Sequence, residues 1–269
     1  AHAKWLRSEE GGKRAVLTDA VLTRAVLTRA DLTRADLTDA VLTRADLTRA
    51  VLTGADLTGA VLTRAVLTRA VLTRAVLTDA VLTGADLTGA VLTGADLTDA
   101  VLTGAVLTGA VLTGAVLTDA VLTDAVLTGA VLTDAVLTGA VLTRADLTDA
   151  VLTGADLAPI RDDLWAVLSS SPAEVPGLRA AIAEGRVEGS TYTGACACLV
   201  GTLANVRRCE YTAIPGLTPN PARPVERFFA SIGEGDTPET NQFSRVALGW
   251  VDEWLGRMRA AFGQLAASA

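Results

Sequence analysis

The chain is poor in aromatic side chains, which make up 4% of its 269 residues although 50% of them are hydrophobic. Its core must therefore be filled by small aliphatic side chains. The chain has a single histidine, His2, and only three cysteines, Cys196, Cys198 and Cys209. So few cysteines, gathered in one short stretch, favour a reducing compartment over a disulfide framework.

Long apolar runs and basic clusters are also missing. Within the repeats described below no apolar run exceeds three residues, whereas a membrane-spanning helix needs about 20. The N-terminus lacks the basic-then-apolar pattern of a signal peptide. The net charge is −7, and no basic patch across the whole chain suits nucleic-acid phosphates. We therefore expect a soluble cytoplasmic protein that binds neither nucleic acid nor a membrane.

A five-residue repeat fills more than half of the chain. From Ala15 the unit Ala-[Val/Asp]-Leu-Thr-[Gly/Arg/Asp] recurs without a slip through Gly154, which gives 28 units. In an α-helix successive leucines would lie about 140° apart and form no stripe. In an extended segment the first and third residues share one side, and a bend at the fourth and fifth residues restores the phase. Each unit is therefore predicted to be a short strand and a corner around a core of Ala and Leu.

The repeated pattern A-[D/N]-L-x-x resembles that of the pentapeptide repeat proteins over residues 15–158. The resemblance implies a mainly β fold, a right-handed quadrilateral β-helix in which four units make one coil, about seven coils in all. Natural members vary their third and fourth positions, whereas Leu and Thr dominate here, which indicates a regularised sequence of consensus or engineered origin. The stretch KWLRSEEGGKRA, Lys4 to Ala15, resembles the segment before the first coil of such proteins, so we expect residues 1–14 to form an N-terminal cap in which Trp5 covers the leucine column.

If four units form a coil, residues 20 apart stack in columns. One second-position column contains no acidic residue, and we call it the valine face: Val21, Val41, Val61, Val81, Val101, Val121 and Val141. The column two faces away is Asp31 followed by valines, and the other two columns mix Val with Asp. The valines either serve only as strand formers that cover one another, or form a contact face for a homodimer or another protein partner.

The fifth positions, at the corners, segregate by charge. One corner, here the acidic corner, holds five aspartates, of which the last three are consecutive: Asp19, Asp39, Asp79, Asp99 and Asp119. The next, here the basic corner, begins with Arg24, Arg44 and Arg64, and the one after it with Arg29, Arg49 and Arg69. Some pentapeptide repeat proteins resemble duplex DNA in shape and charge and engage DNA gyrase. A DNA-mimicking topoisomerase regulator is therefore an alternative function, although valine and corner arginines weaken that resemblance.

Repetition stops at Pro159, and residues 159–269 are predicted to form a mostly α-helical capping domain. The segment resembles domains that follow pentapeptide repeats in some bacterial and phage proteins. Helical patterns cover 161–169, 178–182 and 195–207, a further helix opens at Pro224, and the last is expected to start at Thr237-Pro238-Glu239. The stretch Ser171-Pro172-Ala173-Glu174 resembles a capping box.

No motif in the chain carries catalytic chemistry. Cys196, Cys198 and Cys209 lack a fourth zinc ligand and a nearby histidine base, so they are expected to be buried structural thiols. The acid pairs Asp162–Asp163 and Asp252–Glu253 are expected on solvated helix faces. We therefore predict a non-catalytic structural or interaction scaffold without cofactor or metal. A thiol or metal enzyme in the C-terminal domain is the weakest alternative.

Overall fold

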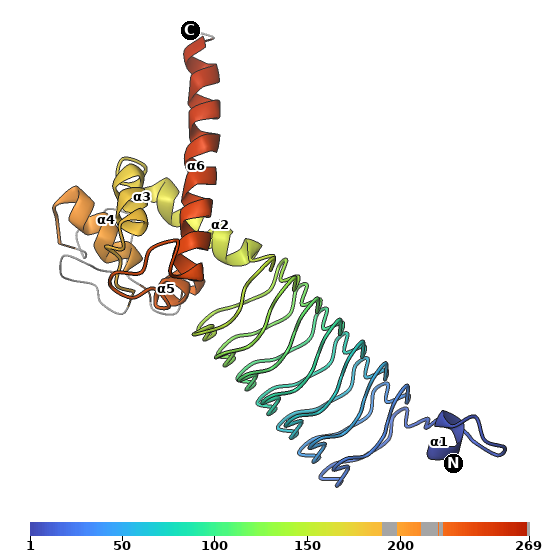
Figure 1. The fold of residues 1–269 in the computed structure, drawn as a ribbon. Helices are drawn as coiled ribbons and strands as arrows, with labels where there is room; N and C mark the ends of the chain where they lie inside the picture. The colour runs from blue at the N-terminus through green and yellow to red at the C-terminus, as the bar shows by residue number, and fades with distance from the viewer. Residues whose placement is uncertain (190–197, 211–219, 221–222, 268–269) are drawn as a thin grey trace. The chain divides into compact units, whose positions relative to one another are not determined.

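The computed structural model of the chain describes residues 1–189, 198–210, 220 and 223–267. The chain divides into two compact units, Ala1–Pro159 and Ile160–Ala269. The first unit holds the repeats, preceded by the short helix α1 (His2–Leu6), and the second unit holds most of the helices (Figure 1).

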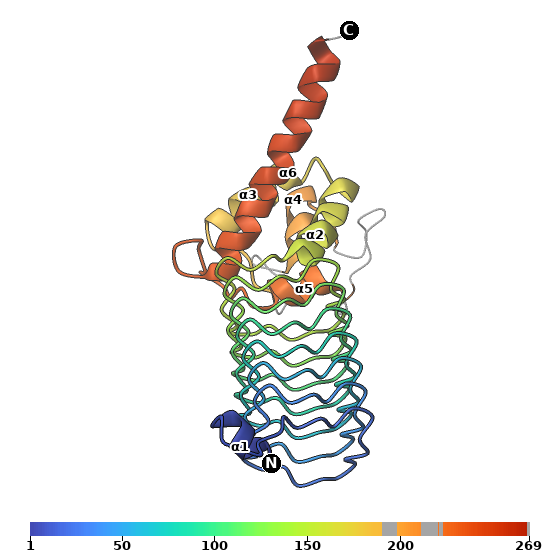
Figure 2. The same ribbon diagram turned by 90° about the vertical axis from the view of Figure 1, so that its right-hand side faces the viewer.

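The repeats wind into stacked coils that lie one above another (Figure 2). The second residue of each unit forms an isolated parallel bridge with the residue 20 positions later, from Val16↔Asp36 to Val136↔Asp156. At the first of these bridges the Leu17 N–H donates to the Asp36 carbonyl at 2.7 Å, and the Asp36 N–H donates to the Ala15 carbonyl at 2.9 Å. One coil therefore contains four units, and each unit is hydrogen-bonded to the coils before and after it.

A tight turn at the third to fifth residues of each unit produces the corner. In the first unit the Ala20 N–H donates to the Leu17 carbonyl at 3.0 Å across Thr18 and Asp19. The corner residue is left-handed, with φ of +56° at Asp19 and +63° at Gly109. A turn with positive φ at its third position favours glycine, yet Arg or Asp holds 17 of the 28 corners.

The predicted mainly β fold, a right-handed quadrilateral β-helix, is wrong for this structure, because the described residues contain no β-strand and no sheet. The physical reason is the length of the unit. In each unit only the second residue forms a bridge to a neighbouring coil, and the turn begins two residues after it. The contacts between coils are therefore single bridges, and all regular secondary structure in the described part of the chain is helical.

The core of the first unit consists of alternating alanine and leucine. From Leu37 to Leu132 every Ala and Leu of the repeats is at most 1% exposed. This burial agrees with the inward and outward sides expected from the sequence. Burial of so many aliphatic groups is the main force that holds the coils together.

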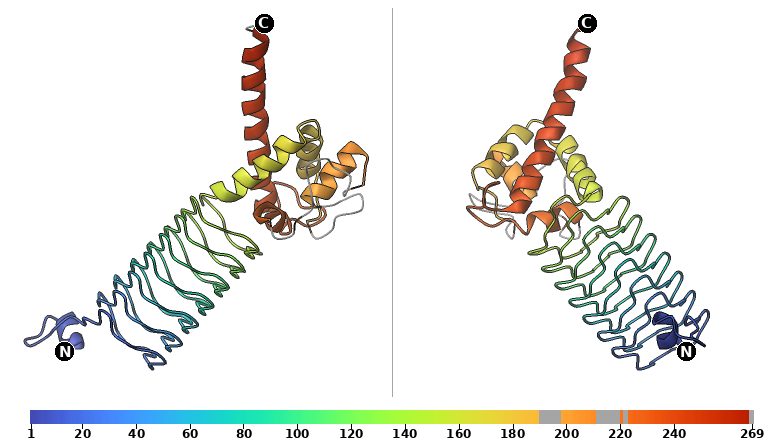
Figure 3. Two further views of the ribbon diagram at one scale, coloured as in Figure 1. Left: turned by 180° about the vertical axis from the view of Figure 1, so that it is seen from behind. Right: turned by 45° about the vertical axis from the view of Figure 1, so that its right-hand side comes forward.

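The second unit is helical. Its elements are α2 (Ala158–Ser170), which begins just before the unit boundary, α3 (Val175–Ala183), α4 (Leu199–Arg207), α5 (Pro224–Phe229) and α6 (Gln242–Ala267). Helix α3 packs against α4 and α6, and α4 packs against α5. The C-terminal part of α6 extends beyond the other helices of this unit (Figure 3).

Several predicted helix starts need correction. The last helix begins at Gln242 and not at Thr237, because Asn241 caps it: its Oδ1 accepts from the Phe243 and Ser244 N–H groups at 2.7 and 3.1 Å. The predicted capping box does not form. Helix α3 begins at Val175, Glu174 makes no side-chain cap bond, and the Ser171 hydroxyl has no partner among the described residues. The helix predicted from residue 195 is described only from Leu199, since 190–197 lie outside the described residues.

Candidate interaction surface

The valine face is a continuous column of outward side chains. Each of its valines bridges the next one, from Val21↔Val41 to Val121↔Val141. The end residues Val21 and Val141 are 77% and 43% exposed, while the five valines between them are half-buried by their stacked neighbours. Stacking therefore covers part of each valine, as the first interpretation requires, but leaves an apolar strip accessible.

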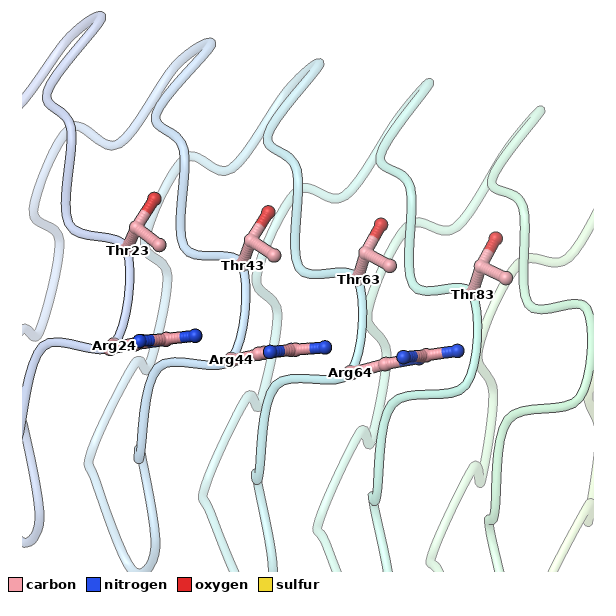
Figure 4. A pocket seen from close by; sticks show the side chains of 7 residues that line it. All are labelled: Thr23, Arg24, Thr43, Arg44, Thr63, Arg64 and Thr83. Atoms are coloured by element: carbon pink, nitrogen blue, oxygen red, sulfur yellow. The ribbon is translucent and has the colours of Figure 1, made fainter.

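The basic corner borders this face. Its first three arginines and the adjacent threonines line a shallow groove: Thr23, Arg24, Thr43, Arg44, Thr63, Arg64 and Thr83. Figure 4 shows the arginine side chains lying parallel, each extended toward the following coil. A second groove on the next corner is lined by Arg29, Arg49, Arg69 and four threonines. Among the described residues no ion pair is formed by any of these six arginines.

The aspartates at the second position of the units differ from the corner residues, because they accept hydrogen bonds from threonines of the repeats. The Thr38 N–H and hydroxyl donate to Asp36 Oδ1 at 3.2 and 2.9 Å, and these bonds lower the pKa of Asp36 below its usual value. For Asp86, burial raises the pKa, but bonds from Thr88 and Thr68 outweigh burial and leave the pKa lowered. These carboxylates are therefore bonded to the threonines of their own and adjacent coils.

The family model described as pentapeptide repeats matches this chain in eight copies, over residues 15–54, 55–94, 95–134 and 120–157. These matches span more than half of the chain. The chain belongs to the pentapeptide repeat family. No curated protein matches it.

Solved structures similar to this pentapeptide repeat protein include Rfr23 from the cyanobacterium Cyanothece 51142, with 37% identity over 34% of this chain and a TM-score of 0.32. The present chain spans 60% of the length of Rfr23. HetL, involved in heterocyst differentiation regulation in Nostoc sp. strain PCC 7120, is 31% identical over 58% of this chain and 93% of its own, with a TM-score of 0.20. QnrB1, a plasmid-mediated fluoroquinolone resistance protein, is 18% identical over 56% of this chain and 90% of its own, with a TM-score of 0.34.

The N-terminal segment of this pentapeptide repeat protein contacts the repeats through His2, Trp5 and Arg14, whose guanidinium pairs with Asp36 at 3.1 Å. His2 Nδ1 accepts from the Ala15 N–H at 3.0 Å, and the Trp5 ring stacks on His2 at 5.5 Å. The Arg34 guanidinium carbon lies 5.8 Å from the Trp5 ring centroid. Leu17, Leu22 and Leu27 are still partly exposed, so covering of the leucine column by Trp5 stays a prediction.

The cysteines show a mixed outcome. Cys198 is 3% exposed, and burial raises its pKa, as expected for a structural thiol. Cys209 is only half-buried, and Cys196 lies outside the described residues. In the part of the chain that the structure describes, no three His, Cys, Asp or Glu side chains gather where they could hold a metal ion.

Sequence reasoning missed the role of Asp163. Its carboxylate pairs with Arg223 at 3.2 Å and accepts from the Val225 N–H at 3.1 Å, while burial raises its pKa. It therefore joins α2 to the start of α5 and does not lie on a solvated face. The link connects residues that are distant in the sequence, so no local sequence pattern predicts it. The other three acids of the two pairs are exposed and form surface ion pairs, for instance Asp252 with Arg179 at 2.5 Å.

None of the helices in the described part combines the length and the apolarity that crossing a bilayer requires.

Replacing Thr38 with valine should raise the pKa of Asp36 toward its ordinary value, because it removes the hydroxyl donor. Because the pKa of Asp36 is lower in the folded state, its ionised carboxylate stabilises the fold at pH values above the unfolded pKa of about 3.9. This stabilisation is lost as the pH falls through the folded-state pKa. The variant should therefore lose less stability on acidification in that window. Carbon-detected NMR titration of the Asp36 carboxyl measures the shift. Thr43→Val, in a unit without Asp, is the control, and an unchanged Asp36 titration in Thr38→Val would contradict the assignment.

Proposed function

We propose that this pentapeptide repeat chain is a non-catalytic interaction scaffold whose valine face binds protein. The observation that carries the proposal is the composition of that column. Seven valines follow one another there, while an aspartate occurs in each of the other three second-position columns. A partly exposed apolar strip with charged corners on both sides has the composition of a protein contact surface.

Other features fit a scaffold better than an enzyme. The described carboxylates of the repeats are bonded to threonines or stand at exposed corners, and the buried thiol of Cys198 has a raised pKa, which disfavours a reactive thiolate. We also propose that residues 1–14 and 159–269 act as caps, because an open coil presents unpaired backbone groups that recruit other chains.

The DNA-mimicking alternative is less well supported. The acidic corner, with Asp79, Asp99 and Asp119, is the feature that favours it. A DNA mimic requires negative charge along its whole surface, but eight corner arginines occupy the N-terminal coils, and none of them forms an ion pair in the part of the chain that the structure describes. Gyrase inhibition that disappears when the three aspartates become asparagine would revive this alternative.

Site-specific photo-crosslinking tests the proposed binding surface. A photoreactive phenylalanine analogue at position 81, in place of Val81, should form an adduct with one defined protein, identified by mass spectrometry. The matched control is position 76. Val76 bridges Asp56 and Asp96, so its column is interrupted by charge on both sides. Equal adducts from both positions, or none from position 81, would contradict the proposal.

A further inference from the structure

We infer that the partner of the valine face is a second copy of this chain, packed parallel to the first about a two-fold axis along the coil stack. The inference rests on the proposed function, since it takes the valine face as the binding surface. Its basis is the charge on the two edges of that face.

The two edges carry opposite charges in the first two coils, where Asp19 faces Arg24 and Asp39 faces Arg44 across the valine face. In the later coils one edge is glycine, except that Asp119 and Asp124 are both acidic. Residues 19 to 24 run across the face from the acidic corner to the basic corner, with Val21 between them. Within the described part of the chain, the acidic-corner aspartates and the arginines Arg24, Arg44 and Arg64 form no ion pairs, whereas Arg144, further along the basic corner, pairs with Asp124 of that corner. The apolar strip separates the two edges, so neither edge neutralises the other within one copy.

Symmetry then selects the orientation of the partner. When two identical faces meet about an axis parallel to the coil stack, each edge lies against the opposite edge of the partner. The N-terminal arginines then meet the acidic corner, and the one like-charged contact is Asp119 with Asp124. When the axis is perpendicular to the stack, each edge meets itself in reverse order, so Asp39 meets Asp119, Asp79 meets Asp79 and Arg24 meets Arg144, and Arg44 with Asp124 is the one pair of opposite charge. Like charges in apposition disfavour the second arrangement. A symmetric, self-complementary interface is also the common form of homodimers.

The spacing of the charges matches only a partner with the same repeat. Acidic and basic corners both recur once per coil, about 4.8 Å apart, whereas each strand of duplex DNA advances about 3.4 Å per phosphate. The arginines lean toward the following coil, since the Arg64 Cγ lies 3.5 Å from where a Cβ on Gly84 would be (Figure 4). This lean sets Arg64 level with Asp79 of the partner and Arg24 level with Asp39, while Arg44 is level with Gly59.

Arginine is disfavoured at the basic corner by the backbone conformation and by the neighbouring charges. Arg24, Arg44 and Arg64 have φ of +59°, +59° and +57°, in the left-handed region that suits glycine. Three like charges are stacked in consecutive coils, which adds repulsion. Later coils of the same corner hold Gly84, Gly104, Asp124 and Arg144, of which the last two form an ion pair, so the coil itself does not require an unpaired arginine.

The expected dimer is weak and sensitive to salt. A face of about seven coils and roughly 10 Å in width gives a flat area of roughly 300–400 Å², below the ~800 Å² per partner of a standard interface. Association should therefore depend on the edge ion pairs, which salt screens. We expect the dimer to form at low salt and to dissociate as the salt concentration approaches about 1 M, where the Debye length falls to about 3 Å.

Charge reversal with sedimentation velocity on the full chain tests the pairing. The triple variant Arg24→Asp/Arg44→Asp/Arg64→Asp and the triple variant Asp19→Arg/Asp39→Arg/Asp79→Arg should each weaken the Kd at least tenfold. An equimolar mixture of the two should form a heterodimer, because both of its edges are then complementary. The matched control, Arg29→Asp/Arg49→Asp/Arg69→Asp, changes the same net charge in the same coils on a corner outside the valine face. It should leave the Kd within threefold.

Thiol cross-linking with a short bis-maleimide tests the orientation, because faces packed about 10 Å apart are too distant for a direct disulfide. In a parallel dimer position 41 faces its own copy, so Val41→Cys should form a symmetric cross-link. In an antiparallel dimer position 41 faces position 121, and Val41→Cys should cross-link only when mixed with Val121→Cys. Val51→Cys, on the opposite column, and the unaltered chain provide the background from the native cysteines.

Several results would overturn the inference. They are a monomer at every concentration at low salt, an equal effect of the two arginine triples, and cross-linking only in the antiparallel mixture. A monomer that retains duplex DNA through its arginines would assign them to phosphate binding instead. The proposed function fails separately: if position 81 still cross-links to another protein, it stands without the homodimer.

Discussion

Replacing Leu107 with alanine should lower the free energy of unfolding of the repeat unit by about 2–5 kcal/mol. Leu107 is 0% exposed, and Leu87 and Leu127, its neighbours in the column, are equally buried. The bridges between coils fix the spacing of the coils, so the coils cannot move together to fill the cavity that the substitution leaves. Equilibrium urea unfolding followed by far-ultraviolet circular dichroism measures the loss.

The matched control is Val101→Asp, made at a protein concentration where the chain is monomeric. Val101 lies in the same coil on the outward side, and other columns already accept Asp beside Val, as at Asp96 and Val116. The Val101→Asp substitution should lower the free energy of unfolding by less than about 1 kcal/mol. If Val101→Asp costs as much as Leu107→Ala, the inward and outward assignment of the two positions is wrong.

The stacking of the repeats was accessible from the sequence because it depends on side-chain chemistry that recurs at every unit. Alanine and leucine at the first and third positions predict the buried core, and grouping by twenties predicts which residues bridge. The strand content was not accessible in this way. A unit forms a strand only if several consecutive residues bridge the neighbouring coil before the turn begins. In the first unit the turn hydrogen bond joins Leu17 to Ala20, so only one residue before it forms a bridge.

The candidate surface was only partly predictable, for a similar reason. The composition of the valine face and of its two edges follows from the period alone. The direction in which Arg64 leans, and the absence of ion pairs at the six stacked arginines of the described structure, require coordinates. In the helical unit, Asp163 and Asn241 act through backbone groups whose positions depend on tertiary packing, so their roles were missed.

Replacing Phe228 with alanine should destabilise the second unit by about 3–5 kcal/mol. Phe228 is 0% exposed, and its ring centroid lies 5.0 Å from that of Phe243 and 5.1 Å from that of Trp250. Helix α5 has only six residues, too few to be stable alone in water. Its conformation therefore depends on Phe228 and on the aromatic side chains of α6.

Urea unfolding followed by tryptophan fluorescence measures this loss, since Trp165, Trp250 and Trp254 all lie in the second unit. Phe228→Leu is the control, because it keeps most of the apolar volume and should cost about 1–2 kcal/mol. The transition of the repeat unit, seen by circular dichroism, should not move, because Leu107 and Phe228 belong to separate cores. If Phe228→Ala shifts both transitions equally, the two units unfold together, and the second unit then contributes directly to the stability of the coils.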